Sequence, residues 1–188
     1  MGVLRYAILG LLNRKDMTGY DLTKEFQASL SEFWGAKHSQ IYPELKVLTE
    51  QNLVTYKTEI TGNVLEKKLY SITESGKKEF IRWEKSNFPM PTLPKDDFKL
   101  QLFFSDCISS DERIQLLNNQ LKQHQQLLEH LRNNLDRFST IPPVEESEFS
   151  DYLVLLGAIS REESSCSWLS HCMELCKKHT VSPKVSKQ

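Results

Sequence analysis

The apolar and polar positions of residues 34–48 divide the surface of a predicted helix into two faces. Ile41, Leu45 and Leu48 recur at helical spacing and are expected to face a core. The opposite face carries hydroxyl, amide, aromatic and ammonium groups, at Ser39, Gln40, Tyr42 and Lys46. Groups of these kinds contact phosphates and base edges in protein–nucleic acid complexes. The pattern therefore predicts a helix with one buried side and one side able to bind a polar partner.

Two further helices are predicted before this segment. The run Val3–Leu12 is nearly all apolar, but at ten residues it is too short to span a membrane. The next helix is expected to begin after Thr18, whose hydroxyl can cap it while Asp21 returns the hydrogen bond. Pro43 lies near the start of the third helix, where its missing N–H costs little. The second helix has an apolar stripe made of Leu22, Phe26, Leu30 and Phe33.

A strand pair and a fourth helix follow. Asn52 comes directly after the third helix and is expected to adopt a left-handed backbone conformation. Leu53–Thr58 and Glu66–Ile72 have the composition of strands, and Thr73 is placed to cap the fourth helix. Three helices, a hairpin and a helix within residues 1–86 are the plan of a winged helix-turn-helix. We therefore predict a mainly α fold with a small β-hairpin.

The chain changes character after residue 86. Segment 87–97 contains three prolines in six residues, which forbid a continuous helix and make a stiff connector. Residues 98–179 are predicted to form a helical, coiled-coil-like dimerisation domain, and residues 180–188 a flexible tail. The very apolar segment that begins at Phe98 is expected to be buried, because one exposed helix cannot carry so many apolar side chains.

Apolar residues between 111 and 138 repeat with an almost strict heptad spacing, which is typical of a coiled-coil seam. His124 interrupts the seam, either as a hydrogen-bonded spacer or as a pH switch. The seam has two possible partners, a second copy of the chain or the chain's own last helix, at about residues 147–178. The predicted dimer interface comprises Ile114, Leu117, Leu121, Leu128, Leu131 and Leu135 from the seam and Trp168 from the last helix.

Composition and charge narrow the possible functions. The chain has 188 residues, 39% of them hydrophobic, and a net charge of −1. Residues 1–86 hold 13 basic against 11 acidic side chains, and residues 87–188 hold 11 against 14. Non-specific affinity for DNA should therefore be modest, and a dimer would be needed to double the contacts. With no run of 18 apolar residues and no signal peptide, we expect a cytoplasmic protein that does not enter a membrane.

Patterns of catalysis and metal binding are nearly absent from the sequence. It contains no glycine-rich phosphate loop, no GxSxG and no HExxH, so neither an enzyme nor a cofactor is predicted. Cys172, Cys176 and His179 share one face of a predicted helix and could bind zinc or sense oxidation. Core packing is the favoured interpretation of these cysteines, and no metal site is predicted.

The sequence resembles the PadR-type transcriptional regulators in short motifs of its first half, which are Ala7–Leu12, Gly19–Leu22, Phe33–Trp34, Gln40–Leu45 and Glu66–Gly76. Asn52 departs from the family pattern, which usually has glycine there, but asparagine tolerates the same backbone region. The ending around Trp168 resembles the long-tailed subgroup, which includes a repressor that responds to phenolic acids and a virulence activator. The run Phe33–Leu48 resembles the phenolic acid regulator most.

The resemblance implies a dimeric repressor that binds an inverted-repeat DNA operator. It also implies release by a small aromatic effector, such as p-coumaric or ferulic acid, and control of phenolic acid detoxification (decarboxylase) genes. The predicted DNA-binding residues are Lys37, His38, Ser39, Gln40, Tyr42, Lys46, Gly62, Lys67 and Lys68. The predicted effector-binding residues, at the junction of the two halves, are Phe33, Trp34, His38, Phe98, Phe103 and Arg161. The alternatives are a different aromatic or drug-like effector, an activator without a small ligand, and a winged helix that binds protein.

Overall fold

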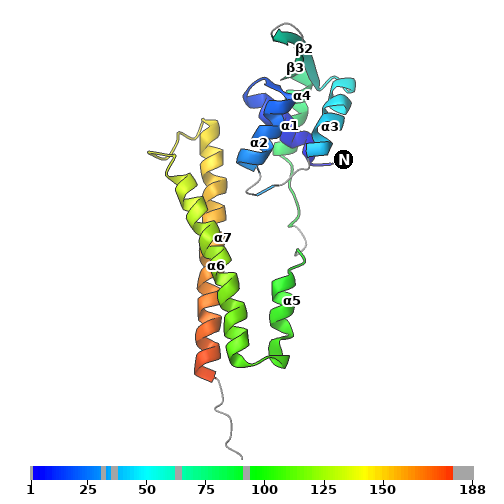
Figure 1. Cartoon of the computed structure of the whole chain (residues 1–188). Helices are drawn as coiled ribbons and strands as arrows, with labels where there is room; N and C mark the ends of the chain where they lie inside the picture. The colour runs from blue at the N-terminus through cyan, green and yellow to red at the C-terminus, as the bar shows by residue number, and fades with distance from the viewer. Residues whose placement is uncertain (1, 31–32, 35–37, 62–64, 91–93, 180–188) are drawn as a thin grey trace, which may run out of the picture. The chain divides into compact units, whose positions relative to one another are not determined.

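The computed structural model of the chain divides into two compact units, Met1–Met90 and Pro91–Gln188 (Figure 1). The boundary falls inside the segment 87–97 that the sequence predicts as a proline-rich connector. Among the described helices, none combines the length and the apolar character that crossing a membrane requires. The structure describes residues 2–30, 33–34, 38–61, 65–90 and 94–179.

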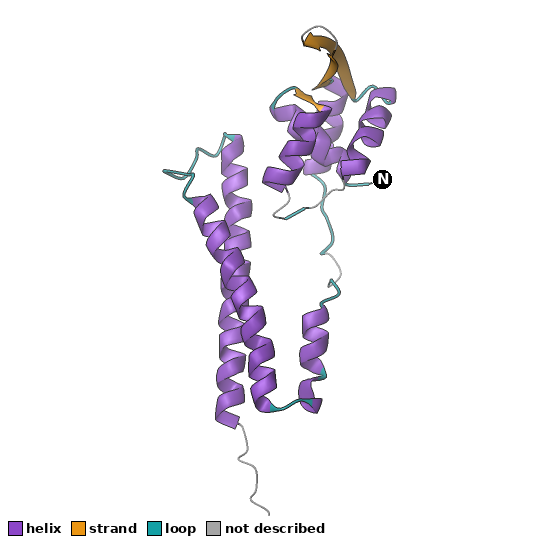
Figure 2. Cartoon of the chain, viewed as in Figure 1, coloured by secondary structure: helices purple, strands orange, loops and turns teal. Residues whose placement is uncertain are grey.

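The first unit contains the predicted helices and hairpin. Its elements are α1 (Leu4–Arg14), β1 (Met17–Thr18), α2 (Gly19–Glu25), the π-helix η1 (Phe26–Leu30), α3 (His38–Glu50), β2 (Val54–Thr61), β3 (Leu65–Ile72) and α4 (Glu74–Glu84). The three strands form an antiparallel sheet in the order β1-β3-β2, and β2 and β3 make a hairpin, the wing, that projects from the helices of this unit (Figure 2). The two-residue strand β1 is an element that the sequence did not predict.

Local hydrogen bonds define the ends of these elements as predicted. Thr18 accepts the backbone N–H of Asp21, and the Asp21 side chain accepts the backbone N–H of Thr18 in return, so the capping box before α2 is confirmed. Thr73 caps α4 by accepting the N–H of Gly76 at 3.0 Å. Asn52 has a φ of 56°, which confirms the left-handed turn after α3.

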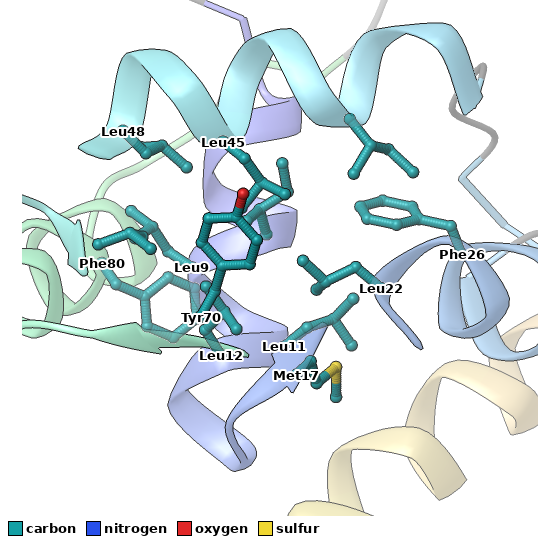
Figure 3. Close-up of a cluster of buried hydrophobic side chains, with 13 residues drawn as sticks. Leu9, Leu11, Leu12, Met17, Leu22, Phe26, Leu45, Leu48, Tyr70 and Phe80 are labelled. Atoms are coloured by element: carbon teal, nitrogen blue, oxygen red, sulfur yellow. The ribbon is translucent and has the colours of Figure 1, made fainter. Parts of the chain in front are cut away.

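A single apolar core holds the first unit together. Leu9, Leu22, Leu45 and Leu48 are fully buried and belong to one cluster with Phe80 of α4 (Figure 3). Burying one such leucine contributes roughly 1.5–3 kcal/mol, so this cluster fixes α1, α2, α3 and α4 against one another.

Two predictions about the first unit's helices are wrong. The second helix ends at Leu30, and Phe33 is 52% exposed rather than part of a buried stripe. The π-helical turn at Phe26–Leu30 takes more residues per turn than an α-helix, so the expected 3.6-residue periodicity is lost there. Pro43 lies inside α3 rather than in its first turn, and it has no N–H with which to reach the carbonyl of Ser39.

The second unit is built on two long helices. It contains α5 (Asp97–Phe103), the 3-10 turn η2 (Ser105–Cys107), α6 (Ser110–Leu135) and α7 (Ser147–His179). Ser109 and Glu112 form the predicted capping box before α6. The helices α6 and α7 run side by side (Figure 1), so the chain's own last helix occupies the heptad seam. Among the predicted interface residues on α6, the single chain buries Leu117, Leu128 and Leu131. The other three, Ile114, Leu121 and Leu135, are half-buried.

His124, the polar residue of the seam, is paired with a buried carboxylate of α7. Its Nδ1 lies 2.5 Å from Oε2 of Glu162, whose side chain is 5% exposed. Arg161 donates its Nε–H to the other carboxylate oxygen at 3.1 Å, and Gln120 Nε2 lies 3.3 Å from His124 Nε2. A buried carboxylate needs such partners, because an unpaired buried charge is very costly. His124 is therefore hydrogen-bonded, as the first of its two interpretations predicted.

The prediction that the apolar segment from Phe98 is buried does not hold within the single chain. None of the seven residues of α5, all of them described, is buried. Leu100, Phe103 and Phe104 are 59%, 77% and 62% exposed, and Phe103 and Phe104 contact each other edge to face with ring centroids 4.9 Å apart. Phe98 packs on Trp168 of α7. A helix this short is unstable alone in water, so α5 needs a further surface.

Candidate nucleic-acid interface

Helix α3 presents a mainly polar surface because three of its apolar residues are fully buried in the core. Ile41, Leu45 and Leu48 are each 0% exposed, whereas Ser39 and Gln40 are exposed on the other side of the helix. The division of this helix into two faces is therefore confirmed. Lys37 and Gly62 lie outside the described residues. His38 is the first residue of α3, and the structure describes its backbone but not its side chain.

Lys46, on the exposed face of α3, forms only a weak ion pair with Glu50. The side chain of Lys46 is 79% exposed, and its Nζ lies 4.0 Å from Oε1 of Glu50, one turn further along the helix. An exposed pair at this distance contributes well under about 1 kcal/mol. The ammonium group of Lys46 can therefore leave Glu50 for a phosphate at little cost.

Tyr42 does not project freely from α3. Its ring lies on Gly19, the first residue of α2, and the side chain is 47% exposed. Burial raises the pKa of the neighbouring Tyr70 hydroxyl, Lys68 lowers it, and Tyr56 and Tyr42 raise it again, so Tyr42 lies within electrostatic reach of the wing. The ring of Tyr42 thus lies between α3 and the start of α2, within electrostatic reach of the wing.

The two lysines of the wing lie on opposite faces of the hairpin, because successive side chains of a strand alternate. Lys68 pairs with Thr58 across the strands, and its Nζ lies 4.2 Å from the ring centroid of Tyr56. Lys67 pairs with Glu59 on the other face. Both lysines are predicted DNA-binding residues, and the geometry gives them different surroundings.

Charges from the wing also reach the start of α2. Hydrogen bonds from Thr18 hold the pKa of the Asp21 carboxyl below its usual value, and the charges of Lys67 and Lys15 lower it further. The cationic group of Lys67 therefore lies near the first turn of α2. Ser39 and Gln40 at the start of α3 and Lys67 and Lys68 on the wing are exposed hydrogen-bond donors, which suit a polyanionic partner.

The predicted effector residues of the first unit have different surroundings. Trp34 is half-buried against the core, with its ring centroid 5.9 Å from that of Phe26. Phe33 is more than half exposed.

In the second unit, the predicted effector residues lie on α5 and α7. Phe98 meets Trp168 edge to face at 6.3 Å between ring centroids. Arg161 lies seven residues before Trp168 on α7, which places both on the same face of that helix, and it bonds Glu162. Phe103 is exposed.

Cys172 of α7 has the properties of a packed rather than a reactive group. Burial raises the pKa of the Cys172 thiol, and Cys176 raises it further. A raised pKa keeps a thiol protonated and lowers its reactivity toward oxidants and metals. Across the described residues, no three histidine, cysteine or acidic side chains are grouped so that they could hold a metal ion.

Comparison with known proteins shows which family this chain belongs to. Residues 8–82 match the family model described as the transcriptional regulator PadR-like family, and residues 94–177 match the model described as virulence activator alpha C-term. The chain is 42% identical over 181 residues to the negative transcriptional regulator PadR of Bacillus subtilis, which covers 95% of this chain and 100% of that protein. The chain belongs to the PadR-like family of transcriptional regulators.

Two solved structures of Bacillus subtilis PadR share this PadR-like fold. The structure in complex with operator DNA has a TM-score of 0.88 at 40% identity and covers 93% of this chain and 99% of that one. The structure in complex with p-coumaric acid has a TM-score of 0.84 at 37% identity and covers 94% and 99%. The predicted family, the winged-helix class and the interpretation as a DNA-binding regulator rather than an enzyme are confirmed.

Proposed function

We propose that this PadR-like chain is a dimeric repressor that binds an inverted-repeat operator and is released from it by an aromatic carboxylic acid. The exposed polar face of α3 beside the wing is the observation that carries the proposal. The two similar structures of Bacillus subtilis PadR, one in complex with operator DNA and one with p-coumaric acid, support both of its parts. In this proposal the regulated genes handle phenolic acids, including their decarboxylation.

The DNA-binding residues follow from the surface of the first unit. Gln40, Tyr42 and Lys46 would enter the major groove, and Ser39 would hold a phosphate near the start of α3. Lys67 and Lys68, on opposite sides of the wing, would contact phosphates of the DNA backbone. Lys37, His38 and Gly62 complete the proposed set on the basis of the sequence alone.

Homodimerisation is proposed from the apolar surface that the single chain leaves exposed. Leu100, Phe103 and Phe104 form a cluster on and after α5, and Trp168 of α7 is 39% exposed. A second copy that covers these residues would remove large aromatic surfaces from water, at roughly 25 cal/mol for each Å². Because Leu117, Leu128 and Leu131 are already buried, we expect the exposed residues to contribute most of the interface.

The effector proposal rests on the chemistry that an aromatic carboxylate requires. Such a ligand needs apolar and aromatic walls together with a cation or several hydrogen-bond donors for its charge. In the second unit, Phe98 and Trp168 offer aromatic edges, and Arg161 offers guanidinium donors beyond the one that bonds Glu162. Phe103 is a further candidate there. Phe33, Trp34 and His38 of the first unit remain candidates on the basis of the sequence.

The proposal is tested first through the wing. We expect replacement of Lys67 and Lys68 by alanine to weaken binding to the upstream promoter duplex similarly for every sequence tested. The slope of log affinity against log salt should also fall by about 0.9 for each phosphate that the variant no longer neutralises. Gel shifts at several salt concentrations provide both numbers. Single variants should each show part of the effect, because the two side chains lie on opposite faces of the hairpin.

Lys78 of α4, which is also exposed, supplies a matched control. Its replacement by alanine removes one positive charge at a position outside the wing. The slope of log affinity against log salt should then stay unchanged. A wing variant that keeps the slope and the affinity of the wild-type chain would remove the wing from the mechanism.

The second candidate function is an activator without a small ligand. The match of residues 94–177 to the virulence activator C-terminal model favours it. A reporter gene behind the bound promoter distinguishes the two, because deletion of the regulator raises expression under a repressor and lowers it under an activator.

A further inference from the structure

The ring of Tyr42 lies directly on the α-carbon of Gly19. A methyl group placed on Gly19 would be 2.5 Å from Cε1 of Tyr42, 3.0 Å from Cζ and 3.2 Å from the hydroxyl oxygen. Favourable carbon–carbon contacts begin at about 3.5 Å, so any side chain at position 19 would occupy space that the ring now fills. The contact joins the start of α2 to the exposed side of α3.

The backbone at Gly19 is held in place from several sides. The capping box of Thr18 and Asp21 fixes the turn that begins α2. The Gly19 carbonyl accepts the hydroxyl of Thr23, a buried residue, at 3.0 Å. Strand β1 ties the preceding residues to the wing, with Thr18 paired to Leu69. If a side chain were added at position 19, the ring of Tyr42 would therefore move and the backbone would not.

Backbone conformation does not explain a glycine at this position. Gly19 is the first residue of α2 and has a helical backbone, which alanine also adopts readily. Glycine in a helix is less favourable than alanine by up to about 1 kcal/mol. The local stability of α2 would thus improve with alanine, and the space needed by the Tyr42 ring is the feature that requires glycine.

We infer that Gly19 is a positioning residue for DNA recognition, which acts by holding the ring of Tyr42 against α2 beside the wing. This inference rests on the proposed function, in which the exposed side of α3 contacts the operator. A ring held against α2 loses little conformational freedom when DNA binds, whereas a ring displaced into solvent must be ordered again. Gly19 therefore contributes to operator affinity without touching DNA.

A double-mutant cycle on the full-length chain tests the inference. The four proteins are the wild type, Gly19→Ala, Tyr42→Ala and the double variant, and the probe is a duplex that the wild type selects from a random library. We expect each single variant to bind about tenfold more weakly, which is the effect of removing one polar interaction with DNA. The double variant should bind no more weakly than Tyr42→Ala, because Gly19 acts only through that ring.

If Gly19 has a purely structural role in α2, the double-mutant cycle should give different affinities. The Gly19→Ala substitution would then weaken binding by the same factor whether residue 42 is tyrosine or alanine, and the inference would be overturned. Thermal unfolding followed by circular dichroism checks that Gly19→Ala remains folded. If that variant is destabilised by the clash, the double variant should regain the wild-type stability, and failure to regain it would also count against the inference.

The remaining outcomes separate this inference from the proposed function. If the wild type selects no duplex, the proposed function and the inference both fall. If the wild type binds but Tyr42→Ala binds equally well, Tyr42 is not at the interface and the inference alone is wrong. If Tyr42→Ala is weakened and Gly19→Ala is not, the position of the ring does not depend on Gly19.

Discussion

Replacing Phe103 and Phe104 by aspartate is expected to convert the proposed dimer into monomers and to lower operator affinity about a hundredfold or more. Both side chains are largely exposed in the single chain, so the substitutions should leave the fold of one protomer intact. In a dimer the new carboxylates would be buried without partners, which is strongly unfavourable. A monomer binds only one half-site, so it lacks the gain from bivalent binding, typically about 10²–10⁴-fold.

Sedimentation measures the oligomeric state, and gel shifts measure the affinity. Ile141 and Val144, between α6 and α7, are similarly exposed at 65% and 70% and provide a matched apolar control. Aspartate at those two positions should leave both quantities unchanged. A Phe103→Asp/Phe104→Asp protein that is still dimeric at micromolar concentration would show that α5 lies outside the dimer interface.

Replacing Gly76 by alanine is expected to destabilise the first unit by about 2–4 kcal/mol. A methyl group on Gly76 would lie 2.1 Å from the carbonyl oxygen of Leu53 and 2.8 Å from Cγ1 of Ile72. The Leu53 carbonyl also accepts the N–H of Thr73 at 3.1 Å, so it cannot withdraw without breaking the junction of α3, the wing and α4. Denaturant unfolding followed by tryptophan fluorescence measures the decrease in stability.

Gly157 of α7 serves as the control, because replacing it by alanine is not expected to lower stability. A methyl group there would have nothing within 4 Å, so Gly157→Ala should be neutral or stabilise α7 by up to about 1 kcal/mol. Equal stability of Gly76→Ala and the wild type would mean that Leu53 and Gly76 are further apart than in this structure.

The first unit was largely predictable because its signals are local. The spacing of Ile41, Leu45 and Leu48 fixes which side of α3 is buried. The caps at Thr18 and Thr73 depend on residues only three positions apart. The length of the second helix was not predictable in the same way, because the π-helical turn follows from packing and not from a residue pattern.

The partner of the heptad seam could not be read from the sequence. A stripe of leucines is equally complementary to a second copy and to the chain's own last helix, and no charge pattern along α6 decides between them. In the structure α7 covers Leu128 and Leu131. The partner of His124 was also hidden, because Glu162 lies 38 residues away and is one acidic residue among many.

In the candidate site, residue types were predictable and their orientations were not. The sequence identified Tyr42, Lys67 and Lys68 as candidates for DNA contact. It gave no sign that the Tyr42 ring rests on Gly19, or that the lysines have different neighbours. The glycine directly after the Thr18 cap was the one available signal, since an ordinary helix start does not require it.

The central claim, an operator-binding regulator released by an aromatic acid, is tested most directly by titrating its promoter complex with ligands. The affinity of the full-length chain for the upstream promoter duplex is measured at fixed salt with p-coumaric acid, ferulic acid and an aliphatic acid of the same charge. We expect the two aromatic acids to lower the affinity by about 5- to 150-fold and the aliphatic acid to leave it unchanged. If none of the three acids alters binding while a dye or drug does, the phenolic acid assignment is wrong, and absence of promoter binding under every condition would contradict the proposed repressor itself.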